Sequence, residues 1–131
     1  MRGGLIFALD EGLFERAAAA LETIGARTVA NPKMGGVAQL QDEAGRLFTL
    51  FDIDPEGIDI AYSEDPFLWA DGVAPMDLES VVTCPFECRW PDLAARCLAV
   101  IAEHSTLSTW VLDSQDKVWD AHSIDPQGLE L

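Results

Sequence analysis

The residues with the best spacing for metal chemistry lie in the stretch FDIDPEGIDIAYSE. Asp52, Asp54, Glu56 and Gly57 match positions one, three, five and six of an EF-hand calcium loop. The match then fails, because position eight is Asp59 rather than an apolar residue and position twelve is a serine rather than a glutamate. The pattern therefore predicts a structural turn and no calcium site.

The cysteines and histidines are the other candidates for chemistry. Cys84, Cys88 and Cys97 form an odd set, which favours reduced thiols over a disulfide framework. A closed zinc site needs four ligands, and His104 and His122 lack the paired spacing of a zinc finger. The position of Cys97 on an apolar helical face predicts a small core residue. Because the sequence also has no P-loop, GxSxG, HExxH or GxGxxG, we expect no enzyme, no metal and no cofactor.

A one-sided acidic segment is the strongest signal in the chain. Residues Leu47 to Cys88 hold ten acidic residues and no lysine, arginine or histidine. Crowded like charges reduce stability, and proteins keep them for solubility, for steering or for a partner. Aromatic side chains among the acids could anchor such a partner. The predicted partner-binding residues are Asp52, Asp54, Glu56, Asp59, Tyr62, Glu64, Asp65, Phe67, Trp69 and Asp71. A merely solvated acidic surface is the alternative interpretation.

The overall charge restricts the class of partner. A net charge of −15 disfavours binding to nucleic acids, which relies on lysine and arginine, and to anionic membranes. The apolar run from Leu5 to Leu9 is too short for a signal sequence or a membrane span. We therefore expect a single cytoplasmic domain over residues 1–131 with a basic protein partner.

Helical and strand periodicities predict the elements that position these residues. The first half reads as a strand, a helix beginning after Asp10 as its N-cap and stopping near Gly25, and then a strand and a hairpin. The second half repeats this pattern with a strand that Pro85 should end or place at a sheet edge, and a helix from Pro91. The other expected elements are strands at Leu5–Leu9, Thr28–Ala30 and Gly57–Tyr62, a loop from Ser63 to Asp77, a strand from Leu78, and hairpins at 37–53 and 109–121.

The two halves also resemble each other in sequence. Asp42 and Arg46 align with Asp113 and Lys117, and IDPEGIDI aligns at the same offset with IDPQGLEL. This alignment suggests a duplication, over about residues 4–60 and 78–131. The alternative is two independent Asp-Pro turns, because this dipeptide followed by glycine favours a type I turn. The expected fold is α+β, with two similar strand-helix-hairpin halves and two helices packed on an antiparallel or mixed sheet.

Two family resemblances follow from these features. The runs ERAAAALETIGARTV and DEAGRLFTLFD are similar to the first module of the vicinal oxygen chelate and bleomycin-resistance-like families. Their metal ligands are strand histidines and glutamates, and neither Leu5–Leu9 nor Leu78–Thr83 offers a histidine, so this resemblance implies a metal-free small-molecule-binding module. By size, charge and lack of catalytic motifs the chain also resembles the immunity proteins of bacterial toxins, which implies inhibition of a toxin whose active site is basic.

Overall fold

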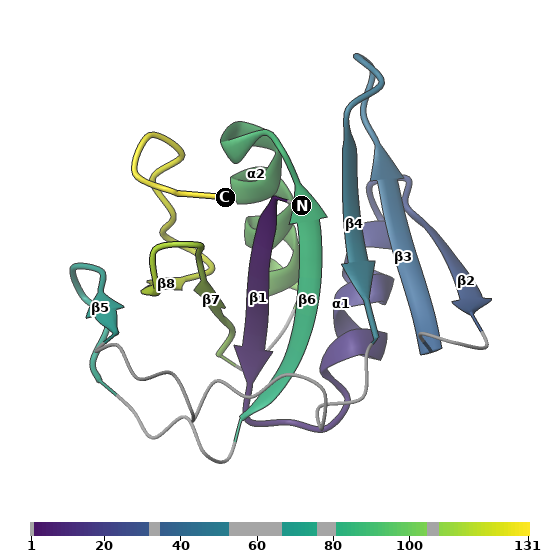
Figure 1. The fold of residues 1–131 in the computed structure, drawn as a ribbon. Helices are drawn as coiled ribbons and strands as arrows, with labels where there is room; N and C mark the ends of the chain where they lie inside the picture. Colours follow the sequence, from purple (N-terminus) through teal and green to yellow (C-terminus); the bar gives the residue numbers. More distant parts are fainter. Residues whose placement is uncertain (1, 32–34, 53–66, 76–80, 105–107) are drawn as a thin grey trace.

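The computed structural model describes residues 2–31, 35–52, 67–75, 81–104 and 108–131. Within these residues, two helices pack on one face of an eight-stranded mixed sheet (Figure 1), which confirms the α+β prediction. The strand order is β2-β3-β4-β6-β1-β7-β8-β5. The elements are β1 (Gly3–Ala8), α1 (Leu13–Glu22), β2 (Arg27–Asn31), β3 (Gly35–Gln41), β4 (Leu47–Phe51), β5 (Leu68–Trp69), β6 (Val82–Cys88), α2 (Pro91–Glu103), β7 (Trp110–Leu112) and β8 (Lys117–Asp120).

Strands β1 and β6 form the centre of the sheet. They pair antiparallel from Gly3 opposite Glu87 to Ala8 opposite Val82. A Cβ atom on Gly3 would lie 1.9 Å from the carbonyl oxygen of Phe86, so only glycine permits this approach. The pairing joins the first half of the chain to the second.

The position of Pro85 corrects the sequence-based expectation. Strand β6 continues past this proline to Cys88 and lies in the centre of the sheet, not at an edge. The N–H of Cys88 donates to the carbonyl oxygen of Arg2 at 3.0 Å, so the alternation of an antiparallel ladder turns the Pro85 nitrogen toward β4. The pairing of β6 with β4 runs from Cys88 back to Phe86 and ends there, so it does not reach Pro85. The missing N–H therefore removes no ladder hydrogen bond.

Helix α1 begins two residues later than its predicted cap. Gly12 is the N-cap and forms no side-chain capping hydrogen bond, so the assignment of this role to Asp10 was wrong. The Asp10 carboxylate instead binds the guanidinium of Arg16 at 2.6 Å, because an arginine one turn into the helix offers a charged partner. The end of the helix is as expected, since Gly25 has a φ of +105° beyond the last turn.

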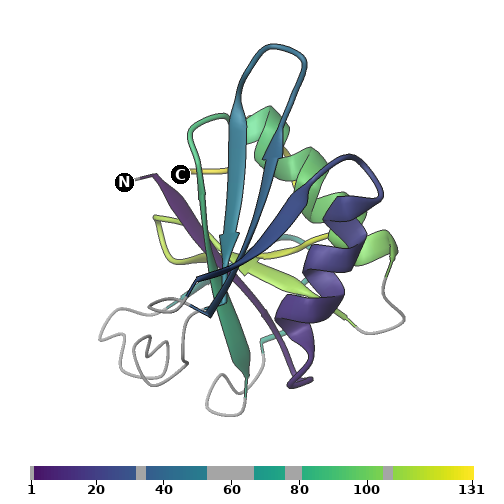
Figure 2. The ribbon, with the colours of Figure 1, turned by 90° about the vertical axis from the view of Figure 1, so that its right-hand side faces the viewer.

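The main hydrophobic core lies between the helices and the sheet. Helix α2 starts at Pro91, as predicted. Both helices lie on the same side of the sheet (Figure 2), and apolar residues of both belong to one core. Apolar residues of both helices form one contact set in this core, with Ile24 and Val100 at its margin. Its members are Leu13, Phe14, Leu21, Ile24, Leu93, Cys97, Val100 and Ile101.

The two predicted hairpins are present and their turns are alike. In the β3–β4 turn, Asp42 accepts hydrogen bonds from the N–H groups of Ala44 and Arg46. In the β7–β8 turn, Asp113 accepts them in the same way from residues 115 and 117. The residue before each basic position, Gly45 or Asp116, has a positive φ. Either duplication or convergent turn chemistry would give this likeness, so the duplication stays a hypothesis.

The segments after the hairpins differ from the expected pattern. The strand predicted at 57–62 lies outside the described residues. Residues 124–131 form a turn without a following strand, and their Glu130 carbonyl accepts a hydrogen bond from the N–H of Ser114 at 2.9 Å. The loop predicted over 63–77 includes the short strand β5, which pairs parallel with β8. Two residues are too few to show a strand period in the sequence.

A second cluster lies on the sheet face opposite the helices. Phe7, Leu112 and Val118 are buried there. Phe67 and Trp69, from β5 and the residue before it, pack against them and so cover part of this face. In the part of the chain that the structure describes, no helix is long and apolar enough to cross a membrane.

Truncating the shared core should destabilise the fold strongly. Leu21→Ala or Ile101→Ala should each lower the free energy of unfolding by about 2–5 kcal/mol, because both side chains are fully buried. Denaturant unfolding followed by circular dichroism measures this change. Leu9→Ala, at a side chain that is 65% exposed, is the control and should change little. Equal stability of all three variants would contradict the core assignment.

Candidate docking surface

Two like charges, Asp52 and Glu15, lie near the end of β4, which is its lower end in Figure 1. Asp52 follows β4, and its N–H donates to the carbonyl oxygen of Gly36 at 2.9 Å. Burial raises the pKa of Asp52, and the negative charge of Glu15 in the first turn of α1 raises it further. Within the described residues neither carboxylate forms an ion pair. A cation placed here would therefore relieve an existing repulsion.

Two arginines of this region and of the hairpin already bind carboxylates within the fold. Arg16 on α1 binds Asp10. At the opposite end of the β3–β4 hairpin, Arg46 binds Asp42 at 2.7 Å and Asp92 at 3.0 Å, which ties the hairpin turn to the start of α2. Burial alone would raise the pKa of Asp42, but hydrogen bonds from Arg46 and its charge lower it overall. Among the described residues, an arginine thus neutralises one end of the hairpin, and none forms an ion pair with the acids at the other end.

Four of the ten predicted site residues are described, and they occupy two places. Asp52 follows β4, whereas Phe67, Trp69 and Asp71 lie at or beside β5, at the opposite edge of the sheet. Five strand spacings separate β4 from β5, which is roughly 24 Å at ~4.8 Å per spacing. The other six, Asp54, Glu56, Asp59, Tyr62, Glu64 and Asp65, lie outside the described residues.

The aromatic pair at β5 is part of a packed cluster. The rings of Phe67 and Trp69 meet edge to face with centroids 6.5 Å apart, and both side chains are half-buried. Trp69 lies beside Val118 in the sheet register. Asp71 is exposed in the turn that follows. Truncation of Trp69 would therefore disturb the fold locally as well as any contact it makes with a partner.

An apolar row crosses the sheet face opposite the helices near β2. Val29, Val37 and Phe51 are cross-strand neighbours in the registers of β2, β3 and β4. Val29 is 60% exposed, and Leu47, on the same face of β4, is 38% exposed. These residues carry no distinctive signal in the sequence, because each follows the ordinary alternation of a strand and none is charged.

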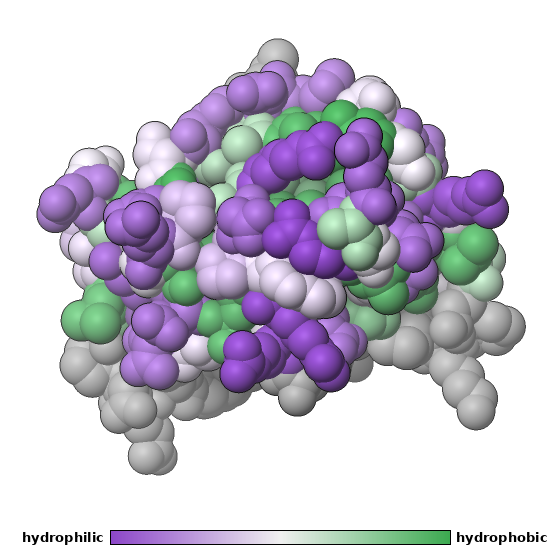
Figure 3. Space-filling view, turned by 90° about the horizontal axis from the view of Figure 1, so that it is seen from above, coloured by the Kyte–Doolittle hydropathy of each residue, from purple (hydrophilic) through white to green (hydrophobic). Residues whose placement is uncertain are grey.

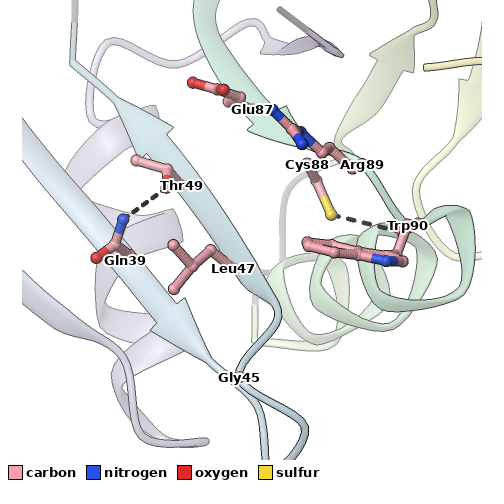
Figure 4. A pocket seen from close by; sticks show the side chains of 8 residues that line it. All are labelled: Gln39, Gly45, Leu47, Thr49, Glu87, Cys88, Arg89 and Trp90. Carbon is pink, nitrogen blue, oxygen red and sulfur yellow. Dashed lines mark hydrogen bonds between the residues drawn. The ribbon is translucent and has the colours of Figure 1, made fainter.

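A cleft of about 350 Å³ opens beside this row (Figure 4). Gln39 donates to the Thr49 hydroxyl at 3.0 Å on one side, and the Trp90 ring lies on the other. A carboxylate and a guanidinium, from Glu87 and Arg89, complete the polar part of its lining. The cleft thus offers one aromatic face and both signs of charge. In the view from above, hydrophilic side chains cover most of the described surface and hydrophobic ones show between them (Figure 3).

The cysteines are placed for packing. All three are buried and form no disulfide with one another, and burial raises the pKa of Cys84 and of Cys97 to about 12. The Cys88 thiol donates to the carbonyl oxygen of Trp90 at 3.5 Å. A thiol with so high a pKa is a poor nucleophile at neutral pH. Among the described residues, no three His, Cys, Asp or Glu side chains gather as a metal site would require.

Neutralising Asp52 should stabilise the protein at neutral pH. Because its pKa is higher folded than unfolded, the folded state loses stability as pH rises through this titration. Asp52→Asn should therefore gain up to about 1 kcal/mol at pH 7, the range of exposed charge pairs. The gain should vanish near pH ~3, below the ordinary aspartate pKa of about 3.9, where wild-type Asp52 is protonated.

Denaturant unfolding at both pH values measures this effect, with exposed Asp71→Asn as the control of equal charge. Glu15→Gln should give part of the same gain, and the double variant less than the sum, because both changes remove one repulsion. An unchanged or lower stability of Asp52→Asn at pH 7 would contradict the described repulsion.

Comparisons with protein-family models, with curated proteins and with solved structures find no match to this chain. Its charges, exposed side chains and geometry are therefore the observations that bear on its function.

Proposed function

We propose that this protein is a non-enzymatic inhibitor that binds a basic protein, and specifically an immunity protein that blocks the basic active site of a toxin with its acidic surface. The observation that carries the proposal is the repulsive pair of Asp52 and Glu15. It lies where the acidic segment leaves β4, and no described residue neutralises it. Such a site is electrostatically suited to a cationic partner.

The charge of the whole chain supports the same proposal. Acids outnumber bases by 23 to 8, and two of those bases, Arg16 and Arg46, already bind carboxylates within the fold. An acidic surface attracts a basic cleft over distances of about a Debye length, ~8 Å at physiological salt. This attraction accelerates encounter, and contacts made at close range then determine how long the complex lasts.

Association kinetics should separate these two contributions. Neutralising Glu64 and Asp65 together should slow association with the partner by about two- to tenfold at low salt and flatten its salt dependence, with little change in dissociation. Trp69→Ala should mainly speed dissociation. Surface plasmon resonance measures both rates with a partner captured from the source cell.

The matched control neutralises Glu43 and Glu130, which are exposed and lie away from Asp52. It removes the same charge and should alter association less. Wild-type rates in the Glu64/Asp65 and Trp69 variants, with the fold intact by circular dichroism, would exclude this surface as the interface.

A second candidate function is a metal-free small-molecule-binding module of the bleomycin-resistance-like type. The observation that favours it is the cleft beside β4, where Glu87 and the Trp90 ring could receive an aromatic cation. Titration with a cationic aromatic drug, followed by tryptophan fluorescence, should then show saturable binding that Glu87→Gln weakens. The immunity proposal predicts no saturable binding in this titration.

A further inference from the structure

Among the residues that the structure describes, nothing pairs with the outer edge of β2. The N–H of Asp52 donates to Gly36, so this β3 residue turns its backbone groups toward β4 and its neighbours turn theirs toward β2. By the same alternation Val29 pairs inward, and the N–H and C=O groups of Thr28 and Ala30 point outward. Within the described residues no strand pairs with this edge and no other backbone group bonds to it. Such an edge is a template for an added strand.

The two sides of this edge differ in chemistry. On the sheet face opposite the helices, Val29 is the outermost residue of the apolar row that it forms with Val37 and Phe51. On the other side lies α1 (Figure 2), whose exposed face carries Glu15 and Glu22. The Glu22 carboxylate accepts a hydrogen bond from the Thr28 hydroxyl at 2.7 Å, which holds a negative charge beside the edge.

We infer that β2 binds an extended segment of the basic partner by β-strand addition. Successive side chains of a strand point to opposite faces. A segment that alternates basic and apolar residues would therefore place its cations beside the acids of α1 and its apolar residues beside Val29. Its backbone would pair with Thr28 and Ala30, which is the established physical mode of strand addition.

Charge selects this occupant over a second copy of the chain. Two copies would each bring a net charge of −15, and such a charge keeps proteins apart. The inference takes from the proposed function only that the natural partner is basic. Strand addition itself is inferred from the edge of β2.

The test uses the full chain and a seven-residue peptide of alternating lysine and valine. NMR titration should shift the amide signals of Thr28 and Ala30 most, and a matched peptide of alternating glutamate and valine should not bind. Ala30→Pro removes an outward N–H without breaking the β2–β3 ladder, and should weaken binding about tenfold. Leu68→Ser, at an exposed residue of the opposite edge strand, should leave binding unchanged.

A second measurement keeps the test decisive should Ala30→Pro fail to fold. A lysine–valine peptide with alternate backbone nitrogens methylated lacks the donors for strand addition and should not bind the wild-type protein. Equal binding of this peptide, equal binding of the glutamate peptide, or a dimer that Ala30→Pro abolishes would each overturn the inference. Failure of the lysine–valine peptide to bind at β2 would overturn it too, while leaving the kinetic test of the proposed function intact.

Discussion

The antiparallel pairing of β1 with β6 is the interaction on which the rest of the structure depends. It joins the two halves of the chain through a close backbone approach at Gly3. Because each half places its helix on the same side of this pair, α1 and α2 share one core. Because both described helices cover one face of the sheet, only other segments can cover the opposite face.

That constraint accounts for the asymmetry of the open face. Over β1, β7 and β8, Phe67 and Trp69 pack with other side chains against the cluster of Phe7, Leu112 and Val118. Toward β2 the exposed Val29 shows that the sheet edge keeps apolar surface in contact with solvent. In the proposed function, the acidic side chains would accelerate encounter with a partner, and this apolar surface would prolong the life of the complex.

The sequence predicted those features that depend on local periodicity or turn chemistry. Both helices and both hairpins could be predicted, because apolar spacing and the turn residues between two strands are local signals. Pro85 shows the limit, since its tolerance in a central strand depends on where the neighbouring ladder ends. Asp10 shows another, because an arginine one turn away competed for its carboxylate.

The candidate site was only partly predictable for a related reason. The charge of Asp52 was visible in the sequence, but its neighbour Glu15 is distant along the chain and close only in the fold. The exposed edge of β2 depends on the order of strands in the sheet, which no local pattern encodes. Long-range arrangement, rather than residue type, is thus what sequence reasoning could not supply.

Backbone hydrogen exchange of the protein, alone and bound to the basic partner that we propose, tests the central claim most directly. The account predicts slowed exchange at Thr28 and Ala30 of β2 and at the start of α1 around Glu15. Protection confined to α2 and residues 124–131, with unchanged exchange along β2 and α1, would contradict it.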